Sequence, residues 1–157
     1  MRRRSLSAGL VAWLGVAALA VAACGGGNSG GGATVVDTTQ LGALGPVLTT
    51  SAGRVLYMFP PDAERHVTCT RRCAAVWPPL TAAGHRAPEA GSGVQQSLLG
   101  TDPDPAGGAA VVTYDGWPLY TYVHDLKPRQ AKGQARFDGG GFWYVIAPSG
   151  QPITVGA

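Results

Sequence analysis

The sequence predicts a small, mostly β domain made of two fused, pseudo-symmetric repeats, each containing a β-hairpin. Two short stretches share the skeleton Tyr-x-aromatic-x-x-Asp and lie 63 positions apart: Tyr57, Phe59 and Asp62, then Tyr120, Tyr122 and Asp125. Short runs of β-branched and aromatic residues alternate with glycine- and proline-rich stretches, which is typical of strands joined by turns. No window keeps a helical period for more than about two turns. These observations favour a β domain that arose by duplication.

The first 23 residues have the order of a bacterial signal peptide. A basic start, Arg2 to Arg4, precedes a short uncharged apolar stretch, and small residues follow before Cys24. The apolar stretch is too short for a typical membrane span. The cysteine resembles that of the lipobox of bacterial lipoproteins, whose thiol receives a diacylglycerol before it becomes the new N-terminus. We therefore expect removal of residues 1–23 and lipidation of Cys24; the alternative is an ordinary signal peptide with an incidental cysteine.

Removal of the signal peptide changes the net charge of the protein. The full chain has 12 basic and 9 acidic side chains, and three of the basic ones, Arg2, Arg3 and Arg4, leave with the signal peptide. Nine of each sign remain, so the net charge becomes zero. Such a chain has no basic field to attract nucleic acid or anionic lipid. Membrane attachment is therefore expected to come from acyl chains on Cys24.

The rest of the chain divides into a tether and one folded domain. Residues 24–33 comprise the lipidated cysteine and a glycine-rich tether. Residues 34–157 are long enough for one small β domain with a single core. Within it we assign repeat one to about 45–80, a connector to 81–109, and repeat two to about 110–148.

The expected strands lie around two turns. The first hairpin has the arms 47–50 and 55–59 around a turn at 51–53, and the second has the arms 110–113 and 117–123 around Asp115-Gly116. Asp-Gly is typical of a two-residue type I′ turn, because both central residues of that turn need positive φ. Further strands are expected at 35–36, 142–146 and 153–155.

Two cysteines, Cys69 and Cys73, remain once Cys24 is committed to lipid. An extracytoplasmic compartment permits disulfides, and a short helical turn near Cys69–Ala75 would bring positions i and i+4 together. A structural disulfide is the first interpretation. The alternative is a thiol redox or copper site, because soft thiolates suit Cu(I) and His66 lies three residues before Cys69.

The repeated Tyr/Asp motif has a structural and a functional interpretation. In the structural one, the aromatic rings pack the core and each aspartate accepts backbone N–H bonds in the turn after its strand. In the functional one, hydroxyls and carboxylates from both halves converge on a small ligand or cation. Two carboxylates alone are too few for calcium, which takes about six to eight oxygen ligands.

A second set of aromatic residues is either core or an exposed binding platform: Trp77, Tyr114, Trp117, Trp143 and Tyr144. The sequence contains no catalytic triad order, zinc spacing, phosphate loop or nucleotide fingerprint. We therefore expect no catalytic residues and no cofactor.

Four segments together resemble a known family: LYMFPPD, CTRRCAAVWPPL, DGWPLYTYVHD and GFWYVIAP. They are similar to those of bacterial secreted-repeat lipoproteins with a Yx(FWY)xxD motif, and the similarity covers most of the domain. By this resemblance, the first motif is Tyr57, Phe59 and Asp62, and the second is Tyr120, Tyr122 and Asp125. The family has no settled biochemical function, so the resemblance implies architecture and location without an activity.

We therefore expect a monomeric, lipid-anchored module on the extracytoplasmic face of the cell membrane. It would bind an unknown small-molecule or envelope ligand, or have a structural role, and it would have no nucleic-acid partner. The alternative is an extracytoplasmic thiol redox or copper-binding protein that uses Cys69, Cys73 and His66, and a hydrolase comes third.

Overall fold

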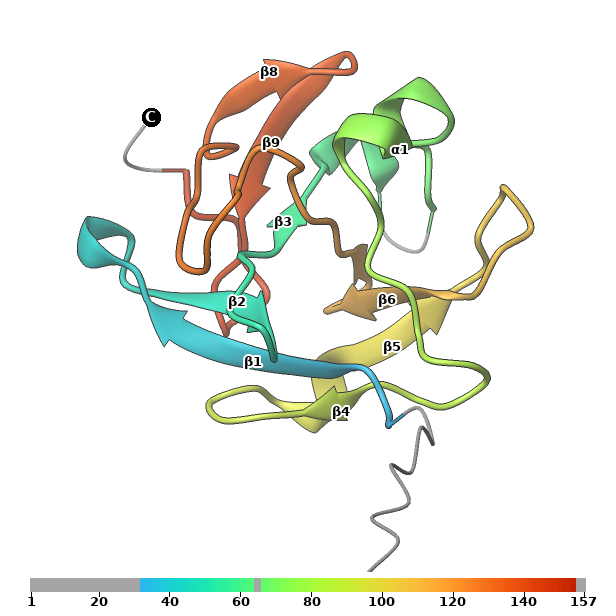
Figure 1. Ribbon diagram of the computed structural model, residues 1–157, viewed down its shortest axis with the longest axis horizontal. Coiled ribbons are helices and arrows are strands. Elements are labelled where there is room, and N and C mark those ends of the chain that lie inside the picture. The colour runs from blue at the N-terminus through green and yellow to red at the C-terminus, as the bar shows by residue number, and fades with distance from the viewer. Residues whose placement is uncertain (1–31, 64–65, 155–157) are drawn as a thin grey trace, which may run out of the picture.

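The computed structural model describes residues 32–63 and 66–154 (Figure 1). The expected signal peptide, Cys24 and most of the tether lie outside these residues, as does the end of the strand expected at 153–155. In the described residues, nine short strands form three three-stranded sheets, in the orders β2-β1-β4, β3-β9-β8 and β5-β6-β7. The protein is therefore mostly β, as predicted.

The strands are β1 (Val35–Gln40), β2 (Pro46–Thr50), β3 (Tyr57–Met58), β4 (Glu89–Ala90), β5 (Leu99–Asp102), β6 (Val111–Tyr114), β7 (Trp117–Pro118), β8 (Arg136–Asp138) and β9 (Gly141–Val145). The helices are the 3-10 helices η1 (Gly42–Leu44), η2 (Pro60–Asp62) and η3 (Gln96–Leu98) and the single α-helical segment α1 (Arg72–Val76) found in the described chain.

The second predicted hairpin forms with the expected turn. Asp115 has φ 52° and Gly116 has φ 80°, so both central residues adopt the positive φ of a type I′ turn. Its second arm, expected to reach Val123, ends at Pro118 as a strand. The chain then leaves its own hairpin, and Tyr120 pairs with the other repeat.

A strand that the hairpin pattern alone did not predict in full precedes each of the two assigned repeats and pairs with its first strand. Strand β1 runs antiparallel to β2, with Thr38 opposite Leu48, and β5 runs antiparallel to β6, with Thr101 opposite Val112. The sequence predicted only the first two residues of β1. Strand β5 lies within the stretch assigned to the connector, where its sequence Leu-Gly-Thr-Asp offers a single apolar side chain as a signal.

The two repeats are interleaved at their tyrosines. Tyr57 and Tyr120 exchange both backbone hydrogen bonds, each with an N···O distance of 2.9 Å. Tyr57 also pairs with Val145 of the second repeat, and Tyr120 pairs with Pro79 of the first. Because each tyrosine strand is completed by the other repeat, neither repeat forms a closed unit alone.

The centre of the main core is a stack of four aromatic rings contributed alternately by the two repeats. The order is Phe59, Trp143, Trp77 and Tyr122, with ring-centroid distances of 4.3, 4.0 and 4.2 Å. The tyrosine rings of the motif meet the tryptophans edge-on: Tyr57 lies 5.4 Å from Trp77, and Tyr120 lies 5.1 Å from Trp143. Trp77 and Trp143 are fully buried, so these two rings form core and not an exposed platform.

Leu56 and Met58, which alternate with Tyr57 and Phe59 along the chain, face a second apolar cluster. Tyr57 and Phe59 belong to the cluster that contains the stack, whereas Leu56 and Met58 pack with Tyr114, Leu119 and other residues in a second cluster. This division follows from strand geometry, because successive side chains point to opposite faces. Both faces of this short stretch are therefore buried, as the apolar residues on both sides predicted.

The repeats differ in the local structure that supplies each tryptophan. Trp77 follows the last residue of α1, whereas Trp143 lies in β9 of the β8–β9 hairpin, and the two elements stand on separate sides in Figure 1. The same ring position is thus filled from a disulfide-bonded helical turn in one repeat and from a hairpin in the other.

We predict that Gly133→Ala lowers the free energy of unfolding by about 2–3 kcal/mol, because the packed stack leaves no room for a methyl group. A Cβ at this position would lie 2.6 Å from Trp77 Cη2, 2.8 Å from Trp77 Cζ3 and 3.1 Å from Tyr57 Cε1. The control is Gly42→Ala, where the added Cβ meets open space and only the φ of +52° costs about 1 kcal/mol. Urea denaturation measures both losses, and equal losses would contradict the prediction.

Candidate functional site

The two Tyr/Asp motifs exchange their hydrogen bonds. The hydroxyl of Tyr57 donates to Asp125 Oδ2 at 2.6 Å, and the hydroxyl of Tyr120 donates to Asp62 Oδ2 at 2.5 Å. Each bond therefore joins the tyrosine of one repeat to the aspartate of the other. We call this pair of bonds the clasp.

The local turn after each motif strand presents the aspartate to its partner. In the first repeat, Pro60 and Pro61 start the 3-10 helix η2, and the Asp62 N–H bonds the Phe59 carbonyl at 2.9 Å. In the second, the Asp125 N–H bonds the Tyr122 carbonyl at 3.1 Å. The three-residue spacing from the second aromatic residue to the aspartate therefore gives the same tight turn in each repeat.

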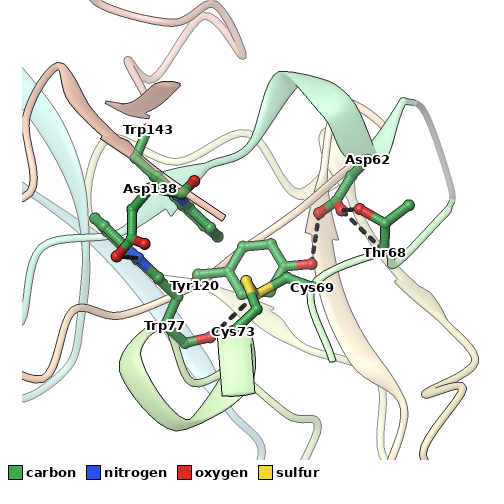
Figure 2. Close-up of a disulfide and its surroundings, with 8 residues drawn as sticks. All are labelled: Asp62, Thr68, Cys69, Cys73, Trp77, Tyr120, Asp138 and Trp143. Carbon is green, nitrogen blue, oxygen red and sulfur yellow. Dashed lines mark hydrogen bonds between the residues drawn. A yellow bond between two sulfur atoms is a disulfide. The ribbon is translucent and has the colours of Figure 1, made fainter. Parts of the chain in front are cut away.

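The second carboxylate oxygen of each aspartate, Oδ1, also accepts hydrogen bonds from the protein. Asp62 Oδ1 accepts the backbone N–H of Thr68 at 2.8 Å and its hydroxyl at 2.5 Å, and Figure 2 shows Asp62 between Thr68 and Tyr120. Asp125 Oδ1 accepts the backbone N–H of Lys132 at 2.9 Å. Both carboxylates therefore have protein partners on both oxygens.

Burial sets the protonation states of the clasp. The pKa of the Tyr57 and Tyr120 hydroxyls is raised well above the ordinary 10.0, first by burial and then by the hydrogen bond to an aspartate. Both phenols therefore remain protonated donors. Burial also raises the pKa of Asp125 above 3.8, although the Tyr57 hydroxyl and the Lys132 N–H oppose the shift.

The clasp has no polar group left for a ligand. Asp62 is 0% and Asp125 is 2% exposed, and in the described part of the chain every buried side-chain nitrogen and oxygen has a hydrogen-bond partner. The six predicted motif residues do converge, but on one another. The geometry favours the structural interpretation of the motif over the ligand-binding one.

Asp138 connects the two stacked tryptophans, a role that the sequence did not predict. Its Oδ2 accepts the indole N–H of Trp77 at 3.1 Å, and its backbone carbonyl accepts the indole N–H of Trp143 at 3.1 Å (Figure 2). Its position before three glycines and ahead of Trp143 is the only signal that the sequence offered.

Cys69 and Cys73 form a disulfide, with an S–S distance of 2.01 Å (Figure 2). Helix α1 begins at Arg72, so Cys69 precedes the helix and the bridge ties the incoming chain to its first turn. The predicted helical turn near Cys69–Ala75 is therefore present, displaced by a few residues. The bridge lies beside Trp77, whose carbonyl is 3.9 Å from Cys69 Sγ.

The disulfide argues against copper binding at Cys69 and Cys73 in this form of the protein. Sulfurs joined to each other are not thiolates, so neither cysteine could bind Cu(I) in this form of the protein. His66 is exposed, and residues 32–63 and 66–154 contain no group of three or more His, Cys, Asp or Glu side chains arranged to hold a metal ion.

Two surface features lie outside the motif and were not predicted as sites. Phe137 and Phe142 are 64% and 47% exposed and face each other across the β8–β9 hairpin, with ring centroids 5.1 Å apart. A cleft of about 870 Å³ lies between residues 82–87 and the loop that joins β5 to β6. The cleft lies mostly in the stretch assigned to the connector, whose small residues show no periodicity, and Phe142 was expected only as part of the strand at 142–146.

Fold and clasp together define a class of protein: a β domain in which two copies of one unit are interlocked. Residues 38–81 and 104–147 each match a family model described as a secreted repeat of unknown function. The chain belongs to this family, which confirms the resemblance seen in the sequence, and the description suggests an extracytoplasmic location. No curated protein and no solved structure was found that matches the chain.

Among the described residues, no helix has the length and apolarity needed to cross a bilayer.

We predict that the effects of substitutions on the free energy of unfolding are coupled between a tyrosine of one repeat and the aspartate of the other repeat that it bonds. Tyr57→Phe and Asp125→Asn should each lower the free energy of unfolding by about 1–3 kcal/mol, with a coupling energy of about 1–2 kcal/mol between them. The matched control pairs Tyr57→Phe with Asp62→Asn in the same repeat, where no hydrogen bond joins the side chains. Urea denaturation of both double-mutant cycles measures the couplings, and a larger coupling in the same-repeat pair would contradict the exchange.

We also predict that Cys69→Ser/Cys73→Ser lowers the free energy of unfolding by about 2 kcal/mol, since the closed loop is short. Reduction of the wild-type protein should give the same loss, and thiol titration of the native, unreduced protein should detect neither cysteine. If oxidised and reduced proteins are equally stable, the disulfide has no structural role and the thiol redox alternative gains support.

Proposed function

We propose that this protein is a lipid-anchored, extracytoplasmic binding module of the cell envelope, and that its repeat motif is scaffold without a catalytic role. The observation that carries the proposal is the closure of the clasp. Its tyrosines and aspartates satisfy one another in the core, so they offer neither a free base nor a free nucleophile to a substrate.

The interlocked core supports a module that holds its surface loops in fixed positions. The paired tyrosine strands, the four-ring stack and the Asp138 bridge between the tryptophans tie both repeats together at one centre. Loops held by such a scaffold are where binding residues are most often found. Ligand recognition is therefore assigned to the surface and not to the motif.

The anchor is assigned from the sequence. Cys24 follows a signal-peptide pattern and small residues, and a glycine-rich tether separates it from the first strand. The chain without residues 1–23 carries no net charge, so acyl chains would have to supply the membrane affinity. This arrangement would hold the domain close to the membrane surface.

The anchoring part of the proposal is tested by Cys24→Ser in a bacterial host that processes lipoproteins. We expect the wild-type protein to enter the detergent phase of a Triton X-114 extraction and to incorporate labelled palmitate. The variant should remain in the aqueous phase without label. Cys69→Ser/Cys73→Ser is the matched control and should partition like the wild type; equal partition of wild type and Cys24→Ser would overturn the anchor.

A further inference from the structure

The cleft between residues 82–87 and the β5–β6 loop arises from a difference between the repeats. In the first repeat, the corresponding loop between β1 and β2 contains Leu41 and Leu44, which pack against the main core cluster. In the second, residues 103–110 contain only Pro, Asp, Ala and Gly. With no large apolar side chain to fill it, the space between residues 82–87 and this loop remains open. Figure 1 shows the β5–β6 loop at the right of the molecule.

The two walls of the cleft carry opposite charges. One wall contributes the Arg86 guanidinium, with the His85 ring next to it in the chain, and the other contributes the carboxylates of Asp102 and Asp104. Within the described chain, the side chains of His85, Arg86 and Asp102 make no hydrogen bond or ion pair with the protein. Asp104 is held in its turn because its Oδ1 accepts the N–H of Ala106 at 2.8 Å. The charges are thus available to a ligand instead of neutralising each other.

Small residues line the cleft between the charged groups. Gly84, Gly107 and Gly108 and several alanines leave the backbone accessible, which lets a small molecule approach it closely. Gly107 has φ +81°, so the turn itself favours glycine there.

We propose that this cleft binds a small zwitterion, a molecule with an ammonium and a carboxylate group, such as a free amino acid or a dipeptide. The proposal rests on the function proposed above, since it names the ligand class of the binding module. The ammonium group donates hydrogen bonds to Asp102 and Asp104, and the Arg86 guanidinium binds the carboxylate. A simple cation or a simple anion would engage only one wall, and it would leave the opposite charges without a partner.

The test is a titration of the purified full-length protein with free amino acids and glycylglycine. Binding is measured by calorimetry and by changes in the amide NMR shifts. At least one zwitterion should bind and shift the amides of residues 84–87 and 101–110. Its N-acetylated and its amidated derivatives should each bind at least about tenfold more weakly, because each lacks one charge. Derivatives that bind as tightly as the zwitterion would overturn the proposal.

Substitutions of the charged cleft residues test whether the ligand binds in the cleft. Asp102→Asn and Arg86→Gln should each weaken binding by about tenfold while the melting temperature stays near that of the wild type, since neither side chain bonds to the protein. Lys127→Gln, an exposed change away from the cleft lining, is the control and should bind normally. Unchanged affinity in both cleft variants would overturn the assignment. A protein that binds none of the ligands yet enters the detergent phase would overturn the cleft proposal and leave the anchored module intact.

Discussion

The exchange of two hydrogen bonds between the repeats is the constraint on which the rest of the structure depends. Each aspartate is almost fully buried, so it needs a donor, and the donor comes from the other copy. A single repeat would leave one carboxylate buried without its phenol, at a cost of about 1–3 kcal/mol or more for a charged group. The backbone pairing of Tyr57 with Tyr120 imposes the same mutual dependence. We therefore interpret the two repeats as one cooperative unit.

The repeats are alike where they meet and differ where they face solvent. The tyrosine strands, the turn before each aspartate and the rings of the stack correspond between copies. By contrast, a disulfide-bonded helical turn in one copy stands where the other has the β8–β9 hairpin, and a leucine-bearing loop stands where the other has an open cleft. Duplication requires that the contacts between copies be kept, whereas each outer loop can change without disturbing the centre. Binding is best sought in these differences.

The sequence predicted the features that depend on local chemistry. The Asp115-Gly116 turn, the two buried faces of 55–59 and the Cys69–Cys73 disulfide follow from turn preferences, strand periodicity and compartment. It did not predict β5 or β8, although each pairs with the next strand along the chain, because their three or four residues offer little apolar alternation. The bond from Asp138 to Trp77 escaped prediction because its two partners lie 61 residues apart. The strand after Trp117 ended early for the same reason: a partner in the other repeat takes over at Tyr120.

The spacing of the motif now has a physical explanation. The first two positions are two residues apart, so both rings point to the same face of a strand. The first ring meets a tryptophan edge-on and the second joins the stack. Three residues later, one tight turn has brought the aspartate back beside the core, where the phenol of the other copy is within 2.6 Å. One more or one fewer residue between ring and acid would point the carboxylate elsewhere and leave the phenol of the other copy without its acceptor. A motif repeated in both halves is therefore what an exchanged clasp requires, and its repetition alone does not indicate two ligand sites.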